Sequence, residues 1–384
     1  MPRLIAILLG LALSAGPAMS QAAAPARTAA ARVAGDTQFA ALVAQLSEAG
    51  AYFDTDNLIS NETSYLHALT PLRRLGVRGG AYLGVGPDQN FSYIAEIRPA
   101  VAFIVDIRRD NMLQHLLLRA LFVQSPTRID YLARLHGRPV PRGPARWQGR
   151  SIEQLVEYID ATPADPRLVA ARRDSTAATI RAFGVPLTPA DYATIARFHD
   201  AFIEAGLGLR FETHGRAPQP YYPTYRQLLL ERDLDGRRAS FLASEQRYGT
   251  VRAMQRAGKI VPVVGDLGGR HTIRAIGAWL RARKIPVSAF YTSNVEFYLM
   301  QDGTFGRFAE NVAALPLGSR SAIIRSYFPG RWGPHPESVR GYYATQLVQR
   351  SADFVREAAG AGYPSYWDLV TSSGVGALPA RQVR

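Results

Sequence analysis

Glycines and acidic residues stand where short apolar runs of this chain end. The run at 81–83 is followed by GVGPDQN (84–90), and the run at 101–105 is followed by Asp106. Glycines after a strand let the backbone approach a ligand closely. An acidic residue ending the next strand can accept hydrogen bonds from the hydroxyls of a ribose, and Asp106 follows Gly84 by about 20 positions, the spacing of nucleotide-binding units. The pattern predicts the first half of a nucleotide-binding fold.

The pattern recurs in the second half of the chain. The run IVPVV (260–264) precedes Gly265 and Asp266, and the run VSAFY (287–291) precedes the segment 292–296, TSNVE. The carboxyl ends of parallel strands meet at one edge of a sheet, where open α/β sheets bind ligands. We therefore expect Asp266, Ser293 and Asn294 to lie near the glycine turn.

The segment 53–69, FDTDNLISNETSYLHAL, is rich in polar residues and precedes a predicted helix that leads to Leu75. In one interpretation these residues only form turns and cap the helix. In the other, the segment is a lid that packs over the glycine turn and presents Asn61 or Glu62 to a ligand. Glu62 and Glu296 are the two candidate general bases.

Five predicted strands, at 81–85, 101–106, 260–265, 287–291 and 321–327, alternate with helices. This alternation predicts an α/β fold, a Rossmann-like and mostly parallel sheet with helices on both faces. Residues 37–124 are predicted to form N-terminal helices and the first half of the core. Residues 125–257 are predicted to be a large helical insertion, which starts with a loop that runs to residue 150. Residues 258–384 are predicted to form the second half of the core and a C-terminal helix. No strand is predicted after 328, and 344–359 is predicted as a helix.

The glycine turn departs from the dinucleotide fingerprint, because Gln89 stands where its third glycine would fall. Together with the acidic residues that follow, it resembles the core of class I S-adenosylmethionine-dependent methyltransferases over 81–111 and 258–328. The chain also resembles an uncharacterised exported bacterial family with the segments YLGVGPDQN, VDIRRDN, VPVVGD and SNVEFYL.

The methyltransferase resemblance implies roles for named residues. Gly84 and Gly86, followed by Asp88, Gln89 and Asn90, would contact the methionine part of S-adenosylmethionine. Asp106 would hold the ribose hydroxyls, Asp266 would meet the adenine amino group, and Ser293 and Asn294 would position the methyl acceptor. The chain departs from the family in lacking an Asn-Pro-Pro-Tyr motif after the fourth strand and a predicted β-hairpin at the end of the sheet.

Residues 1–24 have the pattern of a cleaved signal peptide, with Arg3, an apolar stretch at 4–13 and small residues before Gln21. A linker is predicted at 25–36. The chain has no cysteine to carry a lipid, so we expect a periplasmic or secreted protein with no transmembrane segment in its mature part. Because S-adenosylmethionine is made in the cytoplasm, a second hypothesis remains: an exported protein that binds a nucleoside or another small molecule and has lost the chemistry.

The absence of cysteine excludes disulfides, thiolate metal sites and a cysteine nucleophile. The sequence also lacks a GxSxG or HExxH motif, and we predict no metal site. The formal net charge is +14, but the arginines are scattered, so no dedicated nucleic-acid surface is expected. The aromatic segment at 218–225, PQPYYPTY, is either a packed loop or an aromatic wall for a flat ligand.

Overall fold

A six-stranded sheet in the order β3-β2-β1-β4-β5-β6 forms the centre of the computed structural model, which describes residues 29–215, 217 and 219–372. Its strands are β1 (Ala81–Gly84), β2 (Val101–Asp106), β3 (Ile260–Val264), β4 (Val287–Ser293), β5 (Leu317–Tyr327) and β6 (Thr345–Arg350). β1 to β5 run parallel, and β6 pairs antiparallel with β5. The strand order reverses between β1 and β4, which is where such sheets bind ligands.

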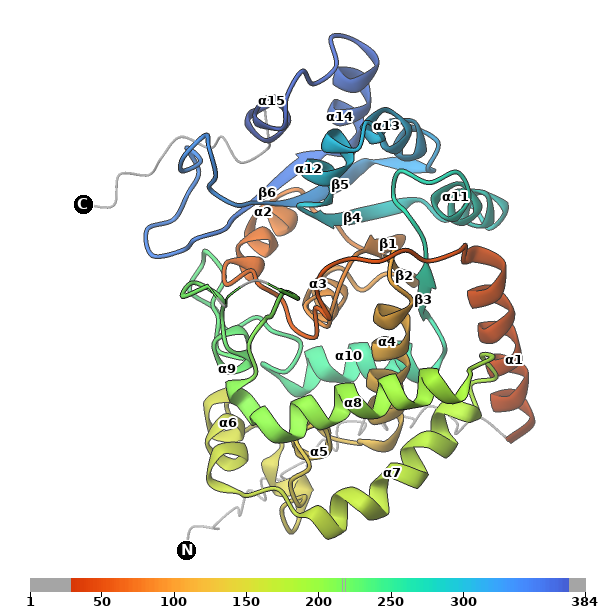
Figure 1. Ribbon diagram of the computed structural model, residues 1–384, viewed down its shortest axis with the longest axis vertical. Helices are drawn as coiled ribbons and strands as arrows, with labels where there is room; N and C mark the ends of the chain where they lie inside the picture. Colours follow the sequence, from red (N-terminus) through yellow and green to blue (C-terminus); the bar gives the residue numbers. More distant parts are fainter. Residues whose placement is uncertain (1–28, 216, 218, 373–384) are drawn as a thin grey trace, which may run out of the picture.

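Helices cover both faces of this sheet (Figure 1), with α3, α4 and α10 on one face and α11, α13 and α14 on the other. Their bounds are α2 (Leu69–Arg74), α3 (Asn90–Ile97), α4 (Arg109–Gln124), α10 (Glu245–Arg256), α11 (Thr272–Ala282), α12 (Val295–Gln301), α13 (Phe305–Ala313), α14 (Ser351–Ala359) and α15 (Tyr366–Thr371). Because β1 and β3 are buried along their whole length, their sequences are continuous apolar runs. The predicted α/β fold is confirmed.

The chain between α4 and β3 forms the predicted helical insertion, most of which lies away from the sheet (Figure 1). Its elements are α5 (Arg128–Leu135), η2 (Pro144–Trp147), α6 (Ile152–Ala161), α7 (Pro166–Arg181), α8 (Pro189–Ala205), η3 (Gly206–Gly208) and α9 (Tyr225–Leu229), followed by α10. The prediction of a loop at 125–150 was wrong in part, because α5 occupies its first half. Thr127 and Asp130 form a capping box that starts this helix.

The N-terminal helix is longer than predicted. α1 (Ala29–Leu46) includes residues 29–36 of the predicted linker, and the many alanines of that stretch favour a helix. The predicted signal peptide lies outside the described residues. Within the described part of the chain, no helix combines the length and apolar character needed to cross a membrane.

The last strand is the main error of the sequence-based prediction. Residues 344–359 were expected to be helical, but β6 occupies 345–350 and only α14 is a helix. The backbone groups of β5 along its outer edge need partners, and β6 supplies them in antiparallel register from Ala322–Arg350 to Tyr327–Thr345. An antiparallel strand pair therefore closes this end of the sheet.

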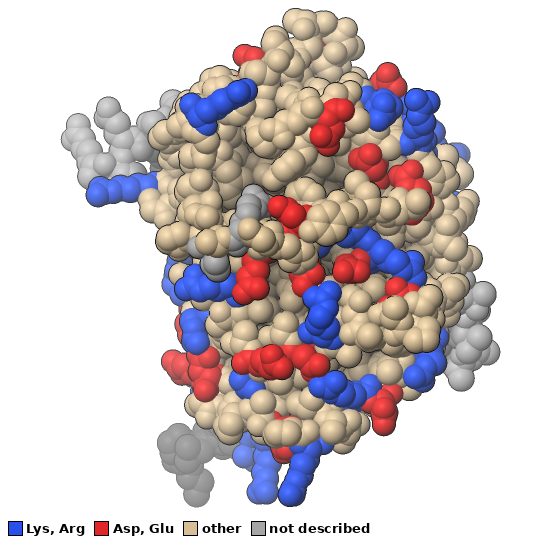
Figure 2. Space-filling view, in the orientation of Figure 1, with Lys and Arg blue, Asp and Glu red and all other residues tan. Residues whose placement is uncertain are grey.

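Charged side chains of both signs are interspersed over the face shown in Figure 2. Ion pairs among the described residues include Arg73 with Asp233 at 2.5 Å and Arg238 with Glu153 at 2.6 Å.

Candidate functional site

The glycine turn after β1 is shaped by the side chain of Asn90. Its Nδ2 donates to the carbonyl oxygens of Val85 (2.8 Å) and Pro87 (2.7 Å). A Cβ on Gly84 would collide with Asn90 Oδ1, and Gly86 adopts a φ of 77°, which favours glycine. Gly84 and Asn90 thus set the shape of the turn, and Gly86 faces the cavity beyond it.

Two buried side chains support the turn from behind. His115 Nε2 donates to the Gly86 carbonyl oxygen at 2.9 Å, and burial lowers the pKa of this histidine to about 4, so its ring is neutral. Asp88 accepts from the Tyr225 hydroxyl at 2.6 Å, and burial raises its pKa to about 6. Asp88, Asn90 and Gly84 were expected to contact the ligand, but none of them lines the cavity.

A cavity of about 310 Å³ lies at the carboxyl ends of β1, β2, β3 and β4; we call it the sheet-edge cavity. Eight of the residues singled out from the sequence line it: Asn61, Glu62, Gly86, Gln89, Asp106, Asp266, Ser293 and Asn294. The first two belong to the segment before η1 (Tyr65–Ala68), and the others end or follow the four strands. The tertiary structure therefore brings together residues that are far apart in the sequence, as the strand-end argument predicts.

Asp106 has a partner that the sequence analysis did not assign to it. Arg108 Nε and Nη2 donate to its two carboxylate oxygens at 3.1 and 3.0 Å, and the Arg108 backbone N–H donates to Oδ1 at 3.0 Å. A carboxylate has about four lone-pair positions, so one remains for a ligand hydroxyl. Arg108 Nη1 also donates to the carbonyls of Thr55 and Asp56, both at 2.7 Å.

Asp266 follows β3 and is held by its own turn. Its Oδ1 accepts from the backbone N–H of Gly268 at 2.8 Å, and its N–H donates to Glu48 at 3.1 Å. Among the described residues, no side chain or backbone group donates to its second carboxylate oxygen, and Asp266 lines the cavity. This is the geometry of an acceptor available to a ligand amino or hydroxyl group.

Glu62 is the most unusual group of the cavity. It is 1% exposed, and its Oε1 accepts from the hydroxyls of Tyr291 (2.7 Å) and Ser293 (2.5 Å), while Oε2 accepts from Gln346 Nε2 (2.9 Å). Burial raises its pKa, and these hydrogen bonds oppose the rise only in part. A carboxyl group with a raised pKa and no cation among these partners is a stronger base than an exposed glutamate.

The segment 52–62 covers the glycine turn, as the lid interpretation predicts. Thr55 Oγ1 donates to the Glu212 carbonyl at 2.5 Å, and the His214 N–H donates to the Asp54 carbonyl at 2.7 Å. The segment is therefore tied to the loop before α9, and it presents both Asn61 and Glu62 to the cavity.

Strained backbone is concentrated at this cavity. Four described residues other than glycine have a positive φ. Arg98 is the C-cap of α3 and Lys284 follows the end of α11, positions where this conformation is common. Asn57 (φ 49°) and Ser293 (φ 53°) instead line the cavity. Such strain persists where the surrounding structure enforces it, and it is frequent at functional sites.

Glu296, the other candidate base, lies outside the cavity. It is fully buried, its Oε1 accepts from Arg325 Nη2 at 3.0 Å, and its Oε2 accepts from the Thr292 hydroxyl at 3.1 Å. The structure therefore places it apart from the cavity residues with which it was expected to act. Glu296 lies in the first turn of α12 and points toward the sheet, where it neutralises the buried Arg325 of β5.

Three residues of the site were missed by sequence reasoning. Arg108 stands two positions after Asp106, and this spacing could have suggested the ion pair. Tyr291 lies in the predicted fourth strand, but nothing in its neighbours singles it out. Gln346 could not have been found, because its strand was predicted as a helix. Within the described ranges, no group of three or more His, Asp or Glu side chains is arranged to hold a metal ion.

The chain was compared with curated proteins and with models of protein families. No curated protein matches it. A family model described as "Domain of unknown function (DUF7790)" matches residues 33–140 and 209–371. The match includes all six strands and every residue of the sheet-edge cavity named above, and it omits α6, α7 and α8 of the insertion. The chain therefore belongs to the DUF7790 family of domains of unknown function.

Proposed function

We propose that this protein binds S-adenosylmethionine in the sheet-edge cavity and has a methyltransferase-like function. One observation carries the proposal: a turn glycine, two aspartates and a hydroxyl-amide pair from four strand ends line one cavity beside the point where the strand order reverses. The antiparallel pairing of β5 and β6 supports it further, because the lack of a predicted β-hairpin was a departure from the methyltransferase pattern.

The residues present fit such a ligand in most respects. Gly86 allows close approach of the methionine part, Asp266 offers a carboxylate oxygen to the adenine amino group, and Asp106 keeps one acceptor position for the ribose. The cofactor supplies an electrophilic methyl group for transfer to an acceptor. The protein's own contribution is to hold the two reactants close together and in the orientation that the transfer needs.

Glu62 and Ser293 are the groups proposed to handle the proton. The Ser293 hydroxyl lies 2.5 Å from Glu62 Oε1 and 3.4 Å from Asn294 Oδ1. Glu62 takes a proton from the acceptor directly or through this hydroxyl. Tyr291 and Gln346 hold the carboxylate in place by donating to it, so they are positioning residues.

The N-terminal sequence favours a second candidate, an exported protein that binds a nucleoside or another small molecule without turnover. Residues 1–24 have the pattern of a cleaved signal peptide, whereas S-adenosylmethionine is made in the cytoplasm. Arg108 uses three of the acceptor positions of Asp106, which leaves one for a ribose in either candidate.

Calorimetric titration tests the proposal with four ligands: S-adenosylmethionine, S-adenosylhomocysteine, adenosine and NAD. A methyltransferase-like site contacts the methionine part, so the first two should bind more tightly than adenosine. A nucleoside-binding protein should bind all three with similar affinity. Asp266→Asn should weaken binding by about tenfold or more, the loss expected for a hydrogen bond to a charged group. Asp165→Asn is the matched control, because Asp165 caps α7 and asparagine caps equally well. No binding of any of the four would contradict the first candidate and would restrict the second to small molecules other than nucleosides.

A further inference from the structure

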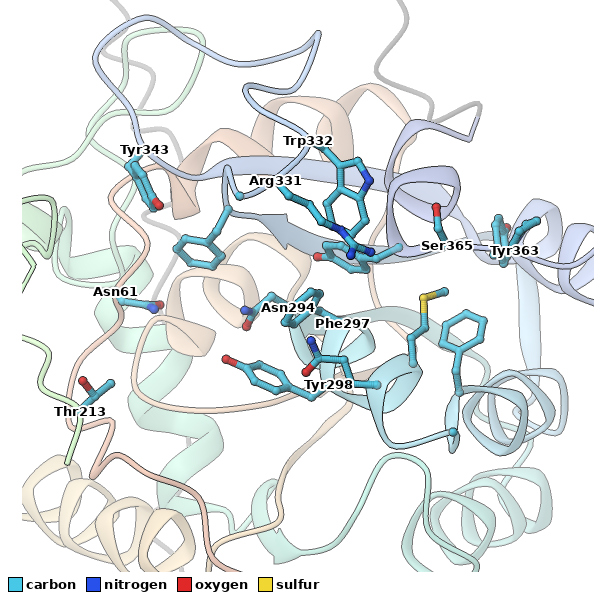
Figure 3. A pocket seen from close by; sticks show the side chains of 18 of the residues that line it. Asn61, Thr213, Asn294, Phe297, Tyr298, Arg331, Trp332, Tyr343, Tyr363 and Ser365 are labelled. Carbon is cyan, nitrogen blue, oxygen red and sulfur yellow. The ribbon is translucent and has the colours of Figure 1, made fainter. Parts of the chain in front are cut away.

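A second and larger cavity of about 930 Å³ adjoins the sheet-edge cavity; we call it the aromatic groove. The two share four lining residues, Asn61, Phe211, Asn294 and Tyr298. In Figure 3, Asn61 and Asn294 face each other across the space between them, while Arg331 and Trp332 reach in from the loop after β5. A molecule in the groove therefore has direct access to Ser293 and Glu62 through this junction.

Half of the described residues that line the groove are aromatic. They come from separate parts of the chain: Tyr221 from the loop before α9, Phe297 and Tyr298 from α12, and Trp332 and Tyr343 from the segment between β5 and β6. Tyr221 and Tyr343 stack on each other with ring centroids 3.6 Å apart. Aromatic faces assembled in this way offer large apolar area and prefer the flat faces or edges of other rings.

The charge of the groove indicates which ligands it can bind. Arg331 is the one charged side chain among its described lining residues. Its guanidinium carbon lies 4.3 Å from the Trp332 ring centroid. Among the described residues, no carboxylate forms an ion pair with Arg331. An arginine held over a ring can still use its N–H groups to bind an anion in a bidentate manner.

We propose that the aromatic groove binds a planar aromatic anion, with its rings against the tyrosine and tryptophan faces and its carboxylate or sulfonate on Arg331. A cationic ligand has no carboxylate to pair with in the described lining. If the proposed function holds, on which this part of the inference rests, this class of molecule is the substrate that meets Glu62 and Ser293 at the junction.

Two fluorescent probes with the same ring system test the proposal. 1-Anilinonaphthalene-8-sulfonate is an aromatic anion, and N-phenyl-1-naphthylamine is its neutral counterpart. We expect both to bind with one site per chain. Arg331→Gln should weaken binding of the sulfonate by about tenfold, as expected for a lost charge-assisted hydrogen bond, and should leave the neutral probe unchanged. Arg340→Gln is the matched control, an exposed arginine of the same loop outside the groove, and should change neither.

Several outcomes would overturn the inference. One is equal sulfonate affinity in Arg331→Gln and the unsubstituted protein. Another is unchanged affinity for both probes in Trp332→Leu and Tyr343→Leu, because it would show that the probes bind outside the groove. A third is competition by cellopentaose, a neutral sugar, which would make the groove a carbohydrate site. These titrations use no nucleoside, and Asp266→Asn should not affect them, so their failure is distinct from failure of the proposed function.

Discussion

Arg108 binds the carboxylate of Asp106 from two positions further along the chain, with its Nε and Nη2 at 3.1 and 3.0 Å from the two oxygens. The same guanidinium binds the carbonyls of Thr55 and Asp56. One side chain therefore joins the end of β2 to the segment that covers the cavity. The acidic residue that a nucleotide site would use for ribose also anchors the lid here.

Arg108→Gln should lower the free energy of unfolding by about 3 kcal/mol or more, because it leaves a largely buried carboxylate unpaired. The side chains of Arg108 and Asp106 are only 7% and 10% exposed. Arg197→Gln, which breaks a more exposed pair with Asp56, should cost less than about 1 kcal/mol. Urea unfolding measures both, and equal losses would show that the buried pair has no special role.

Glu62→Gln and Glu296→Gln are a matched pair of substitutions at buried glutamates. Burial raises the pKa of Glu62 from 4.5, so its folded state favours the neutral form. The stability from that preference is present below pH 4.5 and is lost as the pH rises through the folded pKa. Glu62→Gln should therefore gain stability relative to the unsubstituted protein between pH 4.5 and pH 8.

Glu296→Gln should behave differently, because it leaves the buried Arg325 without its carboxylate. We expect a loss of about 3 to 5 kcal/mol at both ends of that pH range. Urea titrations at pH 5 and pH 8 measure both variants. A relative stability of Glu62→Gln that does not change with pH would contradict the raised pKa.

Ser293 offers a test of backbone strain. At its φ of 53°, glycine avoids the steric cost of a side chain in the left-handed region, about 1–2 kcal/mol. Ser293→Gly should thus be more stable than Ser293→Ala, although both lose the hydrogen bond to Glu62. Ser288 lies in the same strand and is not among the positive-φ residues. There, Ser288→Ala should be more stable than Ser288→Gly by about 0.5–1 kcal/mol. Thermal unfolding of the four variants decides, and the same order at both sites would contradict the strain.

Asp88→Asn should remove part of the pH dependence of stability. Burial raises the pKa of Asp88 from 3.8 to about 6, so the folded protein loses stability as the pH rises through that range. At about 1.4 kcal/mol per pKa unit, the loss approaches 3 kcal/mol. Asparagine still accepts the Tyr225 hydrogen bond, so the variant should match the unsubstituted protein near pH 3.5 and exceed it at pH 7. Identical pH profiles would show that folding does not shift the pKa of Asp88.

The strand ends were predictable because their signals are local. A short apolar run closed by glycine or a polar residue predicts both a buried strand and a ligand-accessible position at the sheet edge, and this pattern identified Gly86, Asp106, Asp266 and Ser293. Glu62 was found as one of two interpretations of a polar segment. The contacts that now give it chemical meaning, from Tyr291 and Gln346, are non-local.

The sequence by itself determined the α/β alternation, the helical insertion and most of the cavity's acidic and glycine residues, since each depends on patterns within a few neighbouring positions. Only the tertiary structure decided which carboxylates face the cavity. Glu62 faces it and Glu296 does not, because one lies in the covering segment and the other on the buried side of α12. It also decided that residues 345–350 form a strand. Their glutamines and apolar residues are compatible with a helix, but the open edge of β5 offers their backbone groups hydrogen-bond partners.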